Sequence, residues 1–359
     1  NSYLIRGRDK TAVIDTVKGR FREEFLEKVK QLVDPAEIDY YIVNHAEPDH
    51  SGSLASMLQL SPRAVVMCTQ AAKTFLGNLM HAPFEAQAVR DGETIDLGGK
   101  TLRFILAPFL HWPDTMFTFL QEEGILFSCD AFGSHYCGAG LYDDEVPDFT
   151  ADTRVYFDGI IRPFRDKVLS ALDKIRHENI GMICPSHGPV LRANSRRYME
   201  LYEEWSRPPE EGKKLAVLYM SPHGNTGKMA LAVAEGARAA GMEADVRHIN
   251  QITPAEIRDL LEQADVVAFG IPTINRDVPK PMWDVLSLLS TVKVKAVSAG
   301  VFGSYGWSGE ACRIAEERLK GQNIKVPHPF VRNPFAPTDE TLDACRSLGR
   351  ALAEEALKN

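Results

Sequence analysis

The chain of 359 residues is long enough for two domains, each with its own core. Its 44% hydrophobic and 25% charged residues are typical of a globular protein and exclude disordered, collagenous and coiled-coil chains. A net charge of −8 and the lack of a long apolar run argue against nucleic-acid and membrane partners, while six scattered cysteines without a C-x-x-C pair fit a reducing cytoplasm.

The first half of the chain mixes apolar runs with amphipathic segments. Apolar residues recur at helical spacing over Phe21 to Val33, which predicts a helix there. Five apolar runs are predicted as strands: Thr11 to Asp15, Asp39 to Val43, Ala64 to Thr69, Thr101 to Ala107 and Ile180 to Pro185. This mixture indicates an α+β arrangement or sandwiched layers, and the strand order stays open.

A stretch rich in proline and charge, residues 206–212, separates the two halves. Pro208, Pro209 and Gly212 interrupt both the helical and the strand patterns, as a linker does. We therefore predict one domain over residues 1–210 and a second over residues 211–359, both of ordinary domain size.

The second half alternates strands and helices along its whole length. Strands are predicted at 215–220, 244–249, 265–272 and 295–304, with a further run before the last helix, and helices at 228–240, 254–263, 282–290, 309–320 and 338–357. Continuously apolar strands that alternate with helices predict a parallel sheet covered on both faces. The second half is therefore expected to be a doubly wound α/β domain.

Four potential metal ligands crowd one loop in the first half. His45, Glu47, Asp49 and His50 follow the predicted strand that ends at Val43. A solvated loop tolerates such residues singly, but four together compete or repel one another unless a cation neutralises them. We interpret the cluster as a metal site, although a short motif of this kind can also arise by chance.

Three further candidates stand at the ends of apolar runs: His111, Asp130 and His187. Each alone could be a turn residue. Together with the first four they make seven ligands, which is too many for one metal and suits two. Asp130 is the natural bridge, because a carboxylate can bind one metal through each oxygen.

The ligand pattern resembles that of metallo-β-lactamase domains, whose hydrolytic members carry H-x-H-x-D-H and bind zinc. Glu47 replaces the second histidine of that motif. The result is three carboxylates with four histidines, a more oxygen-rich set that suits iron better than zinc. The altered motif is similar to that of flavodiiron proteins, also called A-type flavoproteins.

The resemblance implies an αββα sandwich for the first domain and a division of the ligands between two non-haem irons. His45, Glu47 and His111 would hold one iron, Asp49, His50 and His187 the other, and Asp130 would bridge them. Whether His50 and His111 both bind iron is left open. His135, which closely follows Asp130, is a candidate for lining the substrate pocket.

A second constellation follows the predicted strand 215–220. Hydroxyls, glycines and backbone N–H groups over residues 221–228 lead into a helix and can form a phosphate site. The loop is not a Walker motif, because Met229 follows Lys228 where Ser or Thr would be needed. Standing alone, it would be an ordinary capped turn.

Two more loops, 270–276 and 303–309, end neighbouring predicted strands and should converge on the same crevice. There Thr273 and Asn275 could form hydrogen bonds, and Tyr305 and Trp307 could stack on a flat ring. This half resembles a flavodoxin domain that binds FMN, which implies phosphate contacts from Ser221, His223, Asn225 and Thr226. The full predicted set is Ser221, His223, Gly224, Asn225, Thr226, Gly227, Pro272, Thr273, Ile274, Asn275, Ser304, Tyr305, Gly306 and Trp307.

The resemblance implies an oxidoreductase in which FMN relays electrons to a diiron centre that reduces dioxygen to water or nitric oxide to nitrous oxide. It also implies a head-to-tail homodimer or a tetramer, in which the FMN of one subunit lies beside the irons of another. Since no rubredoxin-like module follows Asn359, we expect rubredoxin or a reduced deazaflavin as a separate donor. The family usually carries a further stretch before the opening strand, so we expect this chain to be trimmed.

Two other functions compete with this one. The first is a zinc hydrolase of the metallo-β-lactamase type with a flavodoxin-like accessory domain. The second is an electron carrier whose first domain has lost its metals, and the intact ligand at every position argues against it.

Overall fold

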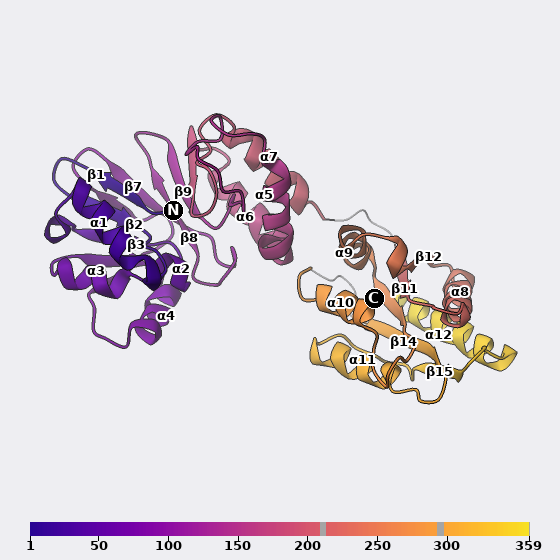
Figure 1. The fold of residues 1–359 in the computed structure, drawn as a ribbon. Coiled ribbons are helices and arrows are strands. Elements are labelled where there is room, and N and C mark those ends of the chain that lie inside the picture. Colours follow the sequence, from indigo (N-terminus) through magenta and orange to yellow (C-terminus); the bar gives the residue numbers. More distant parts are fainter. Residues whose placement is uncertain (209–212, 293–297, 359) are drawn as a thin grey trace. The chain divides into compact units, whose positions relative to one another are not determined.

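The computed structural model describes residues 1–208, 213–292 and 298–358 (Figure 1). The chain divides into two compact units, Asn1–Arg207 and Pro208–Asn359. The predicted domain boundary at residue 210 lies outside the described residues, and so do the first three residues of the predicted strand 295–304. Among the described residues, no helix combines the length and apolarity needed to cross a membrane.

The first unit contains two five-stranded sheets. The first has the order β1-β2-β3-β4-β5 and consists of β1 (Tyr3–Arg6), β2 (Thr11–Ile14), β3 (Tyr40–Val43), β4 (Val65–Cys68) and β5 (Ala86–Ala88). The second has the order β10-β9-β8-β7-β6 and consists of β6 (Thr94–Asp96), β7 (Thr101–Leu106), β8 (Met116–Leu120), β9 (Ile125–Cys129) and β10 (Met182–Pro185). β2 to β5 run parallel to one another, and β10 runs parallel to β9. The loops that follow neighbouring parallel strands therefore lie at the same edge of each sheet.

Side chains between the two sheets form a common core, in which Ile14, Ile42 and Phe104 are fully buried. The outer face of the first sheet packs on α1 (Arg22–Leu32), α3 (Leu54–Leu60) and α4 (Gln70–Met80). The outer face of the second packs on α5 (Thr150–Tyr156), the π-helix Phe157–Ile161, α6 (Arg165–Ile175) and α7 (Ser195–Ser206). The predicted αββα sandwich is thus confirmed (Figure 1).

The described residues of the second unit contain a parallel five-stranded sheet with the order β12-β11-β13-β14-β15. Its strands are β11 (Lys214–Tyr219), β12 (Glu243–His248), β13 (Val266–Gly270), β14 (Ser298–Tyr305) and β15 (Val331–Pro334). One face packs on α9 (Pro254–Gln263), α10 (Lys280–Leu288) and α11 (Ala311–Gly321), and the other on α8 (Asn225–Ala239) and α12 (Asp339–Lys358) (Figure 1). The predicted doubly wound domain is confirmed.

Helix α8 begins at Asn225, three residues earlier than the predicted start at Lys228. Gly224, at φ +79°, adopts the left-handed conformation immediately before it. Because glycine takes this conformation without a steric cost, the chain turns from loop to helix within one residue. The predicted phosphate loop is therefore shorter than expected, and Asn225 to Gly227 belong to the first turn of the helix.

Two glycines let α8 and α12 approach each other closely. A Cβ atom at Gly349 would lie 1.9 Å from the carbonyl oxygen of Val233, and one at Gly236 would lie 1.9 Å from that of Arg346. We expect Gly349→Ala to lower the free energy of unfolding of this unit by about 1–3 kcal/mol, because the helices must move apart. Urea denaturation followed by circular dichroism measures this change.

Gly321 provides the control for that substitution. It ends α11 in the same unit, and a Cβ atom there would meet open space. Gly321→Ala should therefore change the free energy of unfolding by less than about 0.5 kcal/mol. Equal effects of the two substitutions would show that the close helix contact does not limit stability.

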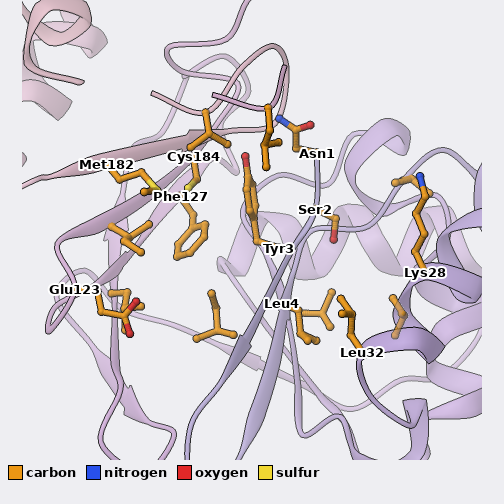
Figure 2. Close-up of a pocket in the computed structure, with 18 of the residues that line it drawn as sticks. Asn1, Ser2, Tyr3, Leu4, Lys28, Leu32, Glu123, Phe127, Met182 and Cys184 are labelled. Atoms are coloured by element: carbon orange, nitrogen blue, oxygen red, sulfur yellow. The ribbon is translucent and has the colours of Figure 1, made fainter. Parts of the chain in front are cut away.

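A mostly apolar cavity of about 810 Å³ opens beside β1 in the first unit (Figure 2). The ring of Tyr3 lies 5.2 Å from that of Phe127 at its wall, and Leu4, Leu32 and Met182 line other sides. None of the seven predicted metal ligands is among its lining residues. The cavity is thus distinct from the site described next.

Five of the six cysteines are buried, namely Cys68, Cys129, Cys184, Cys312 and Cys345, and only Cys137 is exposed. Burial raises the pKa of Cys68, Cys184, Cys312 and Cys345 to about 12. It also holds the pKa of Cys129 well above its ordinary value. Because the thiolate is the reactive form, these five thiols are protected from oxidants and alkylating reagents: they are inaccessible, and they stay protonated.

Candidate metal centre and flavin-binding site

All seven predicted metal ligands lie together at one end of the strands of the first unit. They come from five places: the loop after β3 (His45 and Glu47), the short helix α2, Pro48–Ser51 (Asp49 and His50), the β7–β8 connection (His111), the end of β9 (Asp130) and the loop after β10 (His187). β9 and β10 are paired neighbours, which brings the last two ligands side by side. The sheet order, rather than sequence proximity, assembles the cluster.

The Asp130 carboxylate faces histidines on two sides. Its Oδ2 lies 3.8 Å from His45 Nε2 and 3.6 Å from His111 Nε2. Its Oδ1 lies 3.2 Å from both His50 Nε2 and His187 Nε2. Each oxygen therefore faces its own group of histidines: Oδ2 faces one group and Oδ1 faces the other. This is the geometry of a carboxylate that bridges two metal positions.

Each group of histidines has a carboxylate of its own. Glu47 Oε2 lies 3.2 Å from His45 Nε2 and 3.3 Å from His111 Nε2. Asp49 lies 3.5 Å from His50 Nε2 through Oδ1 and 3.4 Å from His187 Nε2 through Oδ2. The ligand atoms thus fall into the same two sets that the resemblance implies, each close enough to share one ion.

Several of these atoms lack hydrogen-bond partners within the described residues. Asp49 Oδ1, His50 Nε2 and Asp130 Oδ2 are buried and form no hydrogen bond, although other ligand atoms lie close to them. A buried polar atom without a partner costs free energy, and native proteins avoid it unless an ion or a water satisfies the atom. Two cations among these nitrogen and oxygen atoms would satisfy them, so the residues present fit a diiron centre.

Contacts between the candidate ligands shift their pKa values strongly. Burial lowers the pKa of His45, but hydrogen bonds with Asp114 and Glu47 outweigh it and raise the pKa to about 10. Burial also lowers the pKa of His187, but a hydrogen bond with Asp130 outweighs this effect and raises the pKa to about 9. Burial would raise the pKa of Asp130, yet its histidine neighbours hold it well below the ordinary value. Bound cations would take the place of these protons.

Some residues around the ligands were not predicted from the sequence. Asp114 accepts a hydrogen bond from His45 Nδ1, and Tyr156 donates one of 3.2 Å to Asp130 Oδ1. Asp15 lies within 4.8 Å of a His50 ring nitrogen. Asp114 stands three residues after His111, and a single aspartate at this spacing forms no recognised motif.

His135, the predicted pocket residue, is exposed at the edge of this cluster. Its ring lies 5.0 Å from that of Tyr156, in an edge-to-face arrangement. Tyr156 in turn contacts Asp130, so His135 reaches the ligands through one intervening side chain.

The predicted flavin-site residues lie on three loops of the second unit. Ser221, His223 and Gly224 precede α8, Asn225, Thr226 and Gly227 form its first turn, Pro272, Thr273, Ile274 and Asn275 follow β13, and Ser304, Tyr305, Gly306 and Trp307 lie at or after the end of β14. β11, β13 and β14 are consecutive neighbours in the parallel sheet. Their loops therefore meet at one edge.

Hydrogen bonds join these loops. Thr226 Oγ1 lies 2.8 Å from Ser304 Oγ, and the Thr273 N–H donates to the Ser304 carbonyl at 3.1 Å. Ser221 Oγ accepts a hydrogen bond of 3.0 Å from the Gly227 N–H. The loops thus form one connected structure around the start of α8.

This edge has the features that a phosphorylated flat ring requires. The N-cap residue of α8 is Gly224, which has no side chain to cap the helix, and a Cβ atom there would meet open space; the Gly227 N–H is already bonded to Ser221 Oγ. A phosphate would complete that helix end. Trp307 is 78% exposed and Phe335 is 68% exposed, so two large aromatic rings are available for stacking. The residues present fit FMN.

Comparisons with known proteins agree with both units. Residues 1–188 match the family described as ODP family beta lactamase, and residues 217–349 match the flavodoxin family. Among solved structures, rubredoxin oxygen:oxidoreductase from Desulfovibrio gigas superposes with a TM-score of 0.71 at 26% identity, covering 100% of this chain and 90% of that one. The flavodiiron protein from Giardia intestinalis gives 0.70 at 29% identity, covering 100% and 89%.

Two relatives match this chain over nearly its whole length. A type A flavoprotein of Rhodobacter capsulatus is 38% identical, covering 99% of this chain and 83% of the relative. A nitric oxide reductase of Moorella thermoacetica is 37% identical, covering 98% and 90%. At this identity and coverage the relation extends to both units, and the chain belongs to the type A flavoproteins, the family of flavodiiron oxidoreductases.

Proposed function

We propose that this chain reduces dioxygen to water or nitric oxide to nitrous oxide at a diiron centre, with electrons relayed through FMN. The observation that carries this proposal is the position of Asp130, which presents one carboxylate oxygen to each of two histidine groups. The relatives named nitric oxide reductase and rubredoxin oxygen:oxidoreductase support the two substrates.

When both cofactors are bound and reduced, they supply the four electrons that convert dioxygen to two waters, or the two that convert two nitric oxide molecules to nitrous oxide and one water. The side chains hold these cofactors and balance their charge. Glu47, Asp49 and Asp130 bring three negative charges to the centre, which favours retention of iron in its more oxidised form. Tyr156 holds Asp130 through its hydroxyl.

We assign residues 1–210 to the diiron domain and residues 211–359 to the FMN domain. In the first, His45, Glu47 and His111 hold one iron, and Asp49, His50 and His187 hold the other. In the second, the first turn of α8 binds the phosphate, and Thr273, Asn275 and Trp307 flank the ring.

We propose a head-to-tail homodimer, in which the FMN of one copy serves the irons of the other. The donor would be a rubredoxin or a reduced deazaflavin, in line with the donor named for the Desulfovibrio gigas relative. Six free cysteines fit a reducing cytoplasm. Sedimentation would test the dimer, because a monomer that turns over at full rate contradicts it.

The decisive experiment uses anaerobically reduced protein of known metal and flavin content. It is mixed separately with dioxygen and with nitric oxide while the consumption of each gas is followed. Faster dioxygen consumption with water as the product identifies an oxygen reductase, and faster nitric oxide consumption identifies a nitric oxide reductase. Protein that holds zinc and consumes neither gas would contradict the proposal and favour a hydrolase.

Glu47 provides a sharper test of the ligand set. We expect Glu47→His to lower the affinity for iron about tenfold and to favour zinc, because a neutral imidazole replaces an anion between two histidines. Metal analysis after growth with both metals, together with the rate of gas consumption, measures the change. Unaltered iron content and turnover would contradict the assignment of Glu47 as a ligand.

A further inference from the structure

We infer that Asp114 is the positioning residue for one of the two irons: its buried carboxylate fixes the ring of His45 and anchors the loop that carries His111. This inference rests on the proposed diiron function, since it concerns the iron held by His45, Glu47 and His111. The predicted ligand set does not include Asp114. A carboxylate that contacts the far nitrogen of a metal-binding histidine has no sequence motif of its own.

The contacts of Asp114 are few and close. The side chain is 0% exposed, so water does not compete for it. Its two oxygens lie 3.2 Å and 3.1 Å from His45 Nδ1, and Oδ2 accepts a further hydrogen bond of 2.7 Å from the Ala46 N–H. A charged acceptor in such surroundings forms strong, well-directed hydrogen bonds.

These contacts determine which nitrogen of His45 is available. A carboxylate only accepts hydrogen bonds, so the proton of the neutral ring stays on Nδ1. The lone pair of Nε2 is then free, and this atom lies 3.2 Å from Glu47 Oε2 and 3.8 Å from Asp130 Oδ2, on the side where the other ligands gather. Carboxylates in this position orient metal-binding histidines and make them better ligands.

Asp114 also connects two ligands of the same group through the backbone. It stands three residues after His111, so the position of its Cα limits where that histidine can reach. Its own carbonyl accepts a hydrogen bond of 2.9 Å from Thr69 Oγ1 at the start of α4. One anchored residue therefore sets the geometry of both His45 and His111.

The effect should be confined to one iron. The side-chain hydrogen bonds of Asp114 within the described residues go to His45 and Ala46. Asp49, His50 and His187, the second group, are held from α2 and the end of β10. Loss of the Asp114 carboxylate should thus weaken the first iron and leave the second bound.

The test compares Asp114→Asn and Asp114→Ala with the wild-type holoprotein. We expect the affinity for one iron to fall roughly 10- to 100-fold, as is usual when the partner of a metal-binding histidine is removed. Titration with a ferrous chelator should then show one weak and one native iron, and Mössbauer spectra should lose or shift one of two ferrous signals. Asn keeps the shape of the side chain, so this variant decides the matter if Ala does not fold.

Asp143→Asn is the matched control. Asp143 is also a buried carboxylate of the first unit, but it accepts hydrogen bonds from the backbone N–H groups of Arg192, Ala193 and Asn194. This variant should lose stability and keep both irons. A purely structural role for Asp114 predicts the same pattern, with lower thermal stability of the iron-free protein and unchanged iron binding, and that result would overturn the inference.

Two other outcomes are also informative. Equal weakening of both irons in the Asp114 variants would overturn the assignment to a single iron. Wild-type protein that binds fewer than two irons would contradict the proposed function itself. The iron content of the wild-type protein is therefore measured before any variant is made. Failure of the inference and failure of the function are therefore distinguishable.

Discussion

Replacement of Asp130 by asparagine is expected to lower the affinity for both irons by at least about 100-fold, more than the loss of a partner behind a ligand costs. The amide keeps one oxygen and loses the negative charge. Its nitrogen would face either the histidines near Oδ1 or those near Oδ2, all of which lie within 3.8 Å of the present carboxylate. One of the two proposed iron positions would lose its oxygen ligand from this side chain, and the other would face an uncharged oxygen.

Iron analysis after dialysis against a weak chelator measures this loss, and gas consumption should fall with it. FMN content provides an internal reference, since the flavin loops belong to the second unit and should keep their occupancy. Asp143→Asn, the same chemical change at another buried carboxylate, should retain iron. A variant of Asp130 that keeps two irons per chain would contradict the bridging role.

Thr226→Val should weaken FMN binding by roughly 10- to 150-fold. Thr226 is 1% exposed in the first turn of α8, where its hydroxyl lies 2.8 Å from Ser304 Oγ. Valine keeps the shape but cannot form a hydrogen bond to the phosphate. Such a bond to a charged group contributes about 1.5–3 kcal/mol, which corresponds to the stated factor in Kd. Quenching of flavin fluorescence on titration measures it.

Riboflavin separates the phosphate from the ring, because it carries the same ring system without the phosphate. Its Kd should be the same for wild type and Thr226→Val. Thr253→Val is a matched variant in the same unit: it removes the hydroxyl that caps α9 and should lower stability by about 1 kcal/mol without changing FMN affinity. Equal weakening of FMN and riboflavin would place Thr226 at the ring instead of the phosphate.

The fold of the second unit could be predicted almost completely from the sequence. Its three central strands, β11, β13 and β14, are buried on both faces, so each appears as an unbroken apolar run between helices. The fold of the first unit is harder to predict from the sequence. β5 and β6 have three residues each and no buried position, so they leave no apolar run to recognise. The pairing of β9 with β10, from which Asp130 and His187 both emerge, depends on sheet order alone.

The candidate ligands could be recognised in the sequence because metal binding requires particular residue types, and these occur in unusual numbers after apolar runs. Asp114 and Tyr156 could not be found in this way. A single aspartate or tyrosine has many ordinary uses, and only the tertiary structure places one against His45 and the other against Asp130. Residues that support ligands are specified by packing rather than by local pattern.

The distribution of thiols has a practical consequence for spectroscopy. Cys137 is the one exposed cysteine of six, and it lies seven residues after Asp130. A maleimide or nitroxide reagent should therefore attach at a single position of the native protein, without prior removal of the other cysteines. A spin label there would relax faster when paramagnetic iron is bound nearby, which gives a direct magnetic readout of metal loading in solution.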